Sequence, residues 1–478
     1  MMTTSAMIKP VLTVLAAAAL SACSLAPTWQ RPTAPVAAAF PVNPPGAGAA
    51  AAPVADGKAA VDTGWRDFFA DERLRGLIAT ALDNSRDLRT AALRIEEARA
   101  AYNITRADRL PNVNAGLSGT RARSADFRNV GGQGGVAEYY DAGISIPAFE
   151  LDFFGRVRNL SEAALSSYLA TDEARRAAQI STVAEVAKAY FTERAYAEQQ
   201  KLAQDTYEAR RRTYDLTRQR LDVGASSLLD LRLNETLMET ARAQALALAR
   251  QRAQAENALT LLVGAPPAQA ATGPMADDRQ IDAMSAVPAG LPSDLITRRP
   301  DIRAAEQRLR AANANIGAAR AAFFPRISLT AALGSSSPEF SGLFDSGTKT
   351  WSFVPQLTLP IFDAGRNRAN LNLAAVRKDI AVADYERTVQ VAFREVADAL
   401  AARSYLADQV AAQRAIQEAQ AERLRLLQLR FENGVASTLD VLDAQRELFD
   451  AEQQLVQARL LRTTSAIDLY RALGGGLQ

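Results

Sequence analysis

Apolar residues follow two different spacings along this chain, and the same order of spacings occurs twice. Two stretches of about 66 residues without proline, 157–222 and 367–432, carry apolar residues that recur every seven positions. Heptads of this kind predict long helices that pack against other helices along their length. A shorter proline-free stretch follows each of them, at 228–263 and 439–473, and predicts a second helix.

Before each long helix, apolar and polar residues alternate and predict a pair of strands. The predicted strands contain residues 113–117, 140–146, 327–331 and 351–361, and the loops between them contain 129–135 and 334–347. Segments with one apolar face are typical of outer-membrane barrel strands, and an ordinary hairpin on a soluble core gives the same pattern. Further helices are predicted over 65–108 and 293–322, each ahead of a strand pair.

The turn between the two helices of each half has the same residues at the same spacing. A glycine is followed by small residues and a serine, so the glycine is predicted to end the first helix and the serine to cap the second. Five pairs of identical residues are 210 positions apart: Arg220 and Arg430, Gly224 and Gly434, Ser227 and Ser437, Leu229 and Leu439, and Asp230 and Asp440. The chain is therefore predicted to be a tandem duplication.

The N-terminus carries a predicted secretion signal and lipid anchor. Lys9 precedes an apolar run, 11–20, that is too short to span a bilayer, and residues 20–23, Leu-Ser-Ala-Cys, fit a bacterial lipoprotein box. Cys23, the only cysteine, is therefore predicted to be lipidated, and Ser24 in place of aspartate favours the outer membrane. A secreted soluble protein with one free thiol is the alternative. No later stretch has about 18 uninterrupted apolar residues, so any membrane crossing is expected to use strands.

Charge and composition argue against several function classes. The formal net charge is +2 at pH 7, with both signs interspersed and no lysine or arginine block, so no nucleic-acid partner is expected. Histidine is absent, which excludes a Ser-His-Asp triad and a histidine-based metal site. Cys23 is committed to the anchor, and no Walker or dinucleotide fingerprint is present. The chain is predicted not to be an enzyme, with no catalytic residue, no cofactor and no metal site.

Short motifs occur across nearly the whole mature chain, at 23–27, 31–32, 65–69, 149–156, 290–295, 298–302, 442–446 and 473–476. In their order and spacing they resemble the outer-membrane efflux lipoproteins, the OprM and NodT-like branch of the TolC superfamily, which are RND-type efflux outer membrane factors. The resemblance implies a mainly α protomer with a transmembrane β-barrel: a TolC-like tandem-repeat chain whose trimer forms a twelve-stranded β-barrel and a long α-helical periplasmic barrel. A shared barrel would also pair the edges that four strands alone leave open in lipid.

The duplication and the resemblance together predict five segments. They are a signal peptide at 1–22, a lipidated N-terminal linker at 23–64, a first outer-membrane-efflux repeat at 65–266, an equatorial connector at 267–292, expected as a loop, and a second repeat at 293–478.

The resemblance implies a function as the outer-membrane exit channel of a tripartite efflux system. Such a channel passively conducts drugs or other small amphiphiles that an inner-membrane RND-type pump and a periplasmic adaptor deliver. The expected partners are two further copies of the chain in a homotrimer, the adaptor, the pump and outer-membrane lipid. Alternatives are type I protein secretion, metal efflux, or a lipid-anchored coiled-coil scaffold without a pore. Metal efflux is less favoured, since the mature chain has no histidine and few methionines, Met238, Met275 and Met284.

The hairpin turns are expected to dock the adaptor. Their small residues would let another helical hairpin approach closely, and an arginine lies one helical turn before each glycine. This docking set is Arg220, Gly224, Ala225, Ser226, Arg430, Gly434, Val435 and Ala436. Two tight turns that keep only their own geometry are the alternative.

By resemblance, Leu439 and Asp443 match the family's periplasmic gate. Their i, i+4 spacing puts both on one face of a helix. Three-fold symmetry would turn them into an apolar plug and a carboxylate collar, which narrow a channel and select cations. The first copy has Leu229 and Leu233 at these positions, so only the second hairpin would carry the collar. The alternative is that Asp443 pairs with a basic neighbour such as Arg446 on a solvated face.

Overall fold

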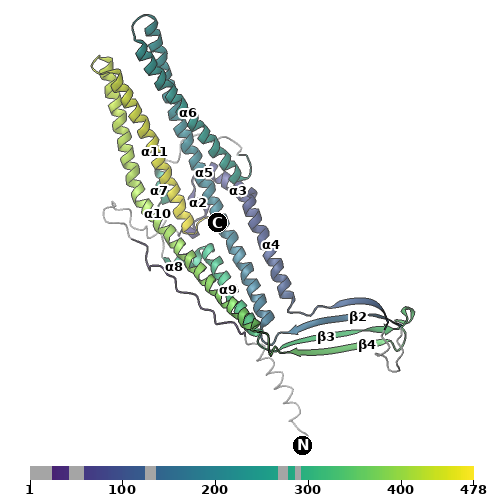
Figure 1. The fold of residues 1–478 in the computed structure, drawn as a ribbon. Coiled ribbons are helices and arrows are strands. Elements are labelled where there is room, and N and C mark those ends of the chain that lie inside the picture. Colours follow the sequence, from purple (N-terminus) through teal and green to yellow (C-terminus); the bar gives the residue numbers. More distant parts are fainter. Residues whose placement is uncertain (1–23, 42–58, 124–135, 267–277, 286–291, 478) are drawn as a thin grey trace. The chain divides into compact units, whose positions relative to one another are not determined.

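The structure is a computed structural model that describes residues 24–41, 59–123, 136–266, 278–285 and 292–477. It divides into two compact units, each built from segments of both predicted repeats. The strand unit comprises described residues up to 33, 94–172 and 304–385, and the hairpin unit comprises those of 34–93, 173–303 and 386–478. Four helices contribute residues to both units (Figure 1): α4 (Arg86–Ala107), α5 (Arg156–Asp222), α9 (Pro300–Ala321) and α10 (Arg366–Glu432).

The strand unit contains one antiparallel sheet with the strand order β1-β2-β3-β4. The strands are β1 (Asn114–Arg123), β2 (Val136–Leu151), β3 (Arg326–Ser337) and β4 (Lys349–Thr358). Both predicted strand pairs are confirmed, and β2 also pairs with β3, from Tyr140 opposite Ser337 to Leu151 opposite Ile327. β1 and β4 are the edges of this sheet, so their outer backbone groups have no strand partner within the described residues.

The last strand pair differs from the prediction at both of its ends. β4 ends at Thr358, short of the predicted end at Ile361, because its partner β3 begins at Arg326, which is the residue opposite Thr358. β3 continues into the predicted loop 334–347, because the Ser336 N–H donates to the Thr348 carbonyl at 2.8 Å. The loop is therefore shorter than its serine and glycine content indicates.

The segment that follows the predicted lipidation site is bound to helices of the strand unit. The Ser24 hydroxyl donates to Asn159 Oδ1 of α5 at 2.9 Å, and Arg31 pairs with Glu306 of α9 at 3.0 Å. Two carbonyls of the segment accept hydrogen bonds from α9: Pro27 from Asn313 at 2.9 Å and Leu25 from Arg320 at 3.1 Å. The start of the predicted linker is thus fixed against the protein.

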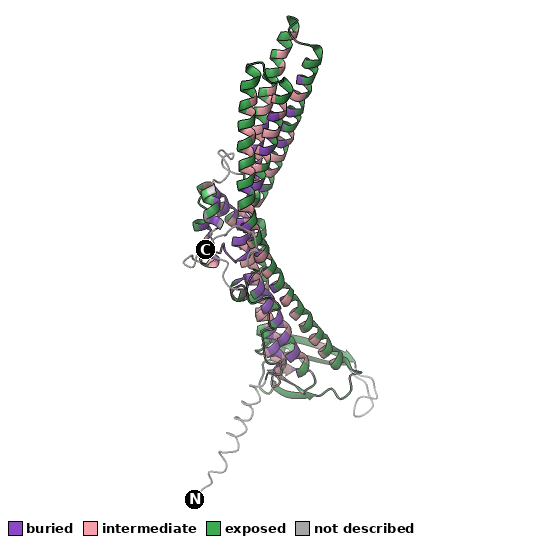
Figure 2. Ribbon diagram, turned by 90° about the vertical axis from the view of Figure 1, so that its left-hand side faces the viewer, coloured by how far each residue is buried: buried purple, intermediate pink, exposed green. Residues whose placement is uncertain are grey.

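Two helical hairpins make up most of the hairpin unit. α5 pairs with α6 (Leu228–Val263) and α10 with α11 (Thr438–Ala472), which confirms the two long and the two shorter predicted helices. α5 and α10 are each 67 residues long. Across the first hairpin, Arg252 pairs with the buried Glu193 at 3.0 Å. Residues near the hairpin ends are mostly exposed (Figure 2). Among the described residues, no helix combines the length and apolar character needed to cross a membrane.

Aromatic side chains form the core of the hairpin unit beside α2 (Trp65–Phe68) and α3 (Glu72–Asn84). Phe68 stacks on Tyr470 of α11 with ring centroids 3.9 Å apart. The Tyr470 hydroxyl also donates to the Thr63 carbonyl at 2.6 Å. The motif at 65–69 therefore supplies core residues, since Trp65, Phe68 and Phe69 are all buried.

Two stretches form short helices that the sequence did not predict. α7 (Asp278–Ser285) lies inside the connector that was expected as a loop, and Ile281 and Met284, one turn apart, give it a buried apolar face. The helix predicted over 293–322 is broken into α8 (Pro292–Arg298) and α9. Pro300 causes the break, because proline lacks an N–H and disfavours helical conformation in the residue before it. The rest of the predicted connector, 267–277 and 286–291, lies outside the described residues.

Arg299 lies at this break and is 8% exposed. It forms ion pairs with Asp301 at 2.6 Å and Glu395 at 2.9 Å, and it donates to the Ala472 carbonyl at 2.9 Å. Burial lowers the pKa of the Arg299 guanidinium, but hydrogen bonds and charges from Asp301 and Glu395 raise it by more. Arg299 therefore joins the start of α9 to α10 and α11 within the hairpin unit.

We expect Arg299→Ala to lower the midpoint of thermal unfolding of the purified protein, measured by circular dichroism. Removing one partner of a buried ion pair costs about 3 kcal/mol, because the groups left behind remain desolvated. Arg298→Ala is the control, since Arg298 pairs with Asp62 at 3.1 Å on the surface and should contribute less than about 1 kcal/mol. Equal destabilisation by the two variants would contradict the conclusion that the buried ion pairs of Arg299 stabilise the hairpin unit.

Candidate docking tips and gate

Each hairpin turns at a glycine with a left-handed backbone, with φ +71° at Gly224 and +73° at Gly434. In the first turn, the Gly224 N–H donates to the Leu221 carbonyl at 2.9 Å, and the Ala225 N–H donates to the Arg220 carbonyl at 2.7 Å. The second turn repeats these bonds, from Gly434 to Phe431 and from Val435 to Arg430, both at 2.9 Å. This Schellman arrangement satisfies the last carbonyls of a helix. The predicted glycine caps are confirmed.

The next helix in each hairpin begins with a capping box, as the repeated serine predicts. Ser437 Oγ accepts from the Asp440 N–H at 3.2 Å, and the Asp440 carboxylate accepts from the Ser437 N–H at 2.9 Å. Ser227 and Asp230 form the same pair of bonds. The serine hydroxyl, followed by the serine N–H, lowers the pKa of each aspartate. The two tips are thus built alike from local contacts.

The residues at the two turns face solvent in the described chain. Gly224 and Gly434 are exposed, and a Cβ added to either would meet no atom within 4 Å, so their φ angles and not a lack of space require glycine. Large apolar side chains beside them are exposed too: Val223 by 78%, Leu228 by 58%, Leu229 by 78%, Val435 by 65% and Leu439 by 69%. We call these turns with their exposed apolar neighbours the tip surfaces. Such apolar exposure is typical of interaction sites.

The docking set contributes to the tip surfaces through its small residues. Arg220 and Arg430 are exposed, and their carbonyls close the turns. The other members are exposed or partly exposed: Ala225, Ser226, Val435 and Ala436. Both turns therefore present a small-residue backbone that a partner could reach.

Asp443 lies on α11 between two arginines of its own hairpin. Its carboxylate accepts from Arg423 of α10 at 2.9 Å and from Arg446, one turn further along α11, at 2.8 Å. All three side chains remain more than one-third exposed. The pairing with Arg446 that the alternative interpretation expected is present. A collar would need three copies of the chain, so the gate stays a prediction.

Leu439 lies one helical turn before Asp443 and is exposed. The positions that correspond to Arg423, Asp443 and Arg446 in the first hairpin are Thr213, Leu233 and Thr236. The whole charged cluster is therefore specific to the second hairpin. Sequence reasoning missed Arg423, although comparison of the two copies could have found it. The first copy has two uncharged residues at the positions of Arg423 and Asp443, and the second copy has a pair of opposite charges there.

Cys23, the predicted lipid anchor, lies outside the described residues. Within the part of the chain that the structure describes, no group of three or more His, Cys, Asp or Glu side chains could hold a metal ion.

The chain matches one protein family in both of its halves, and it matches known proteins over nearly its whole length. The family described as "Outer membrane efflux protein" matches residues 77–265 and 291–475. The outer membrane protein OprJ of Pseudomonas aeruginosa is 49% identical over 97% of this chain and 95% of its own length. The toluene efflux pump outer membrane protein TtgC of Pseudomonas putida is 47% identical over 96% of this chain and 93% of its own length.

Solved structures of related proteins also match nearly the whole chain. A membrane protein from Pseudomonas aeruginosa is 46% identical, with a TM-score of 0.85, and the match covers 94% of this chain and 100% of that one. The MtrE outer membrane channel of Neisseria gonorrhoeae in its open state is 42% identical, with a TM-score of 0.84, and the match covers 95% and 99% of the two chains. The fold described above is therefore that of these channels.

Proposed function

This chain belongs to the outer membrane efflux protein family, and we propose that it is the outer-membrane exit channel of a tripartite efflux system. The observation that carries the proposal is the extent of the match, since both halves of the chain match the family and 97% of it aligns with OprJ. In this proposal the chain is a passive duct and not an enzyme. Its segments are a signal peptide (1–22), a lipidated linker (23–64), two repeats (65–266 and 293–478) and a connector (267–292).

The open sheet supports a trimer. β1 and β4 each leave one edge without a strand partner in the described chain, and unpaired backbone groups are costly in lipid. Three copies could pair β1 of one chain with β4 of the next and close a twelve-stranded barrel. Every residue of β4 is exposed in the single chain, which fits a strand that contacts lipid on one side and a channel on the other.

The tip surfaces are proposed to dock the periplasmic adaptor, which in turn connects to an inner-membrane RND-type pump. Both turns are closed by backbone hydrogen bonds and capping boxes, so local contacts alone define their geometry. Their exposed apolar side chains have nothing to cover them in the described chain. A helical hairpin of the adaptor would bury these side chains and approach closely at Gly224 and Gly434.

The gate is proposed at Leu439 and Asp443. In a trimer, three leucines would narrow the channel and three carboxylates would favour cations. The ion pairs of Asp443 with Arg423 and Arg446 set the orientation of the carboxylate within each chain. The two arginines also offset the charge of each carboxylate, so the cation preference of the collar is expected to be modest while both ion pairs hold.

The names of relatives support small amphiphiles as cargo. Proteins 44 to 47% identical to this chain are named as outer membrane proteins of antibiotic, toluene and solvent efflux pumps. We infer that this channel takes cargo of the same class.

The lipid anchor at Cys23 predicts a specific result for Cys23→Ser. We expect loss of acyl labelling and slower delivery to the outer membrane, while the channel can still assemble, because strands and not the lipid cross the bilayer. Labelled fatty acid incorporation and membrane fractionation measure these effects. A wild-type protein without any acyl label would contradict the anchor.

Planar bilayer recording of the purified protein tests the proposed function. A trimeric exit channel gives single-channel conductance and a trimer band that dissociates on heating, whereas a coiled-coil scaffold gives no conductance. Deletion of the gene should also raise susceptibility to amphiphilic antibiotics and solvents. If only a secreted protein or metal tolerance were affected, the cargo assignment would be wrong.

A further inference from the structure

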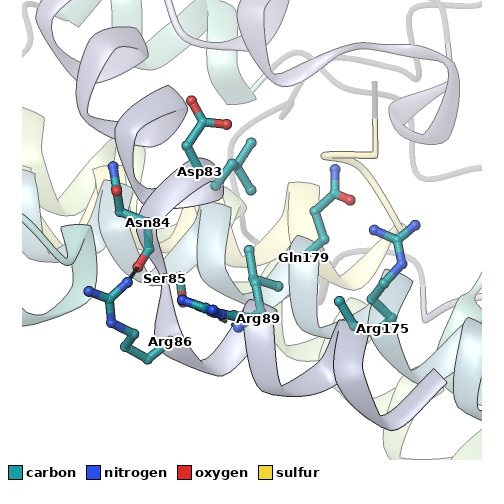
Figure 3. A pocket seen from close by; sticks show the side chains of 10 residues that line it. Asp83, Asn84, Ser85, Arg86, Arg89, Arg175 and Gln179 are labelled. Carbon is teal, nitrogen blue, oxygen red and sulfur yellow. Dashed lines mark hydrogen bonds between the residues drawn. The ribbon is translucent and has the colours of Figure 1, made fainter. Parts of the chain in front are cut away.

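A basic cavity lies in the hairpin unit where α3 meets α4, against α5. Its volume is about 510 Å³. Arg86 and Arg89 come from the first turn of α4, and Arg175 and Gln179 come from one face of α5. Figure 3 shows Arg89 between Arg86 on one side and Arg175 on the other. Leu82, Leu88 and Ala92 add apolar surface to the lining.

The guanidinium groups at this cavity have few partners of their own. Arg86 donates to the Asn84 carbonyl at 3.1 Å, and no carboxylate pairs with Arg89 or Arg175 among the described residues. One acidic side chain, Asp83, lines the cavity, against three arginines. Arginine keeps its charge at any physiological pH, so the cavity has an excess of positive charge. Arg86 and Arg89 are exposed and Arg175 is partly buried, so solvent screens part of their mutual repulsion, and a bound anion would relieve the rest.

The second repeat lacks this arrangement. Arg303 of α9 corresponds to Arg89 of α4, and it is paired with the buried carboxylate of Glu173 at 2.7 Å. The positions that correspond to Arg175 and Gln179 are Tyr385 and Val389. The second repeat therefore neutralises its arginine with a carboxylate of the first repeat and has neither arginine nor glutamine at the other two positions. The first repeat leaves Arg89 without a carboxylate partner among the described residues and has both of these side chains.

We propose that this cavity is a binding site for an oxyanion, a carboxylate or phosphate carried on a small apolar group. The planar guanidinium of arginine binds the oxygens of either anion through two parallel hydrogen bonds. Arg89 and Arg175 hold the anion, Gln179 donates from its amide, and the apolar lining takes the attached group. Gln179 already donates to the Leu477 carbonyl at 3.3 Å, which fixes its side chain at the edge of the cavity. This site is separate from the tip surfaces and the gate, so it does not depend on the proposed function.

The test measures ligand binding to the purified full-length protein in detergent. Inorganic phosphate and hexanoate are titrated at constant ionic strength, with hexanamide as the uncharged analogue, and binding is followed by calorimetry and by the midpoint of thermal unfolding. We expect both anions to bind and to raise the midpoint, and hexanamide to do neither. The double variant Arg89→Gln/Arg175→Gln should weaken anion binding roughly tenfold to a hundredfold, since it removes two charged donors.

A matched variant separates site binding from general salt effects. Arg94→Gln/Arg212→Gln removes the same charge from the same two helices, at exposed arginines outside the cavity. Phosphate stabilises most proteins by exclusion from their surface, and that effect would be equal in both variants. Binding of phosphate alone would assign a phosphate ligand, and binding of hexanoate alone a carboxylate. Absence of binding by both, or equal binding by the Arg89→Gln/Arg175→Gln variant, overturns the proposal.

Discussion

Replacing Leu439 with alanine and Asp443 with serine together is expected to raise the resting conductance of the channel severalfold in planar bilayers. Three copies of each side chain would be removed from one level of the tunnel, which widens it and removes its fixed charge. In cells, the variant should admit large antibiotics such as vancomycin without the pump. Trimer yield should be unchanged, because both side chains are more than one-third exposed in the chain.

The first hairpin offers a matched control for the gate. Leu229→Ala with Leu233→Ser changes the two corresponding positions, which are 78% and 43% exposed. This control should leave conductance near the wild-type value, because only the second hairpin carries the collar. A gate variant that stays as tightly closed as the wild type would place the constriction elsewhere.

A second comparison separates a collar from a surface ion pair. Arg423→Gln/Arg446→Gln leaves the Asp443 carboxylate without the partners at 2.9 and 2.8 Å. If Asp443 lines the channel, its freed charge should increase cation selectivity, measured as a shift in reversal potential across a salt gradient. If the three residues only pair on a solvated face, selectivity stays unchanged and stability falls by less than about 1 kcal/mol.

Local chemistry explains why the tips could be predicted from the sequence. The glycine cap and the Ser437–Asp440 capping box each depend on residues within a few positions of one another. The long helices were equally readable, because their heptads persist over many turns. The break at Pro300 is also readable from the sequence, because proline lacks an N–H and disfavours helical conformation in the residue before it.

Contacts between distant segments explain what could not be predicted. α7 is stabilised by burial of Ile281 and Met284, which depends on the helices around it and not on its own eight residues. The pair of Arg423 and Asp443 spans 20 positions, so it depends on the hairpin register and not on the residues next to Asp443. Once the turn is placed at Gly434, residues about ten positions before and after it face each other. The basic cavity needed α3, α4 and α5 to be placed together, so no single stretch of sequence indicates it.

Gly434→Trp is expected to abolish efflux while leaving trimer abundance unchanged. The indole would project into the space that the adaptor must occupy, since a Cβ added at this position meets no atom of the protein within 4 Å. Efflux is measured as accumulation of a fluorescent substrate in cells that lack the native gene, and trimer abundance by heat-modifiable migration of the extracted protein.

Gly434→Ala is the control that separates docking from backbone strain. Both variants place a side chain on a residue with φ of +73°, which costs about 1 kcal/mol in either case. Only tryptophan adds bulk beyond the Cβ, so alanine should keep most of the efflux if docking is what fails. Equal loss of efflux by the two variants, with less trimer in both, would mean that Gly434 serves only the turn. Retained efflux in Gly434→Trp would show that the adaptor does not approach this tip.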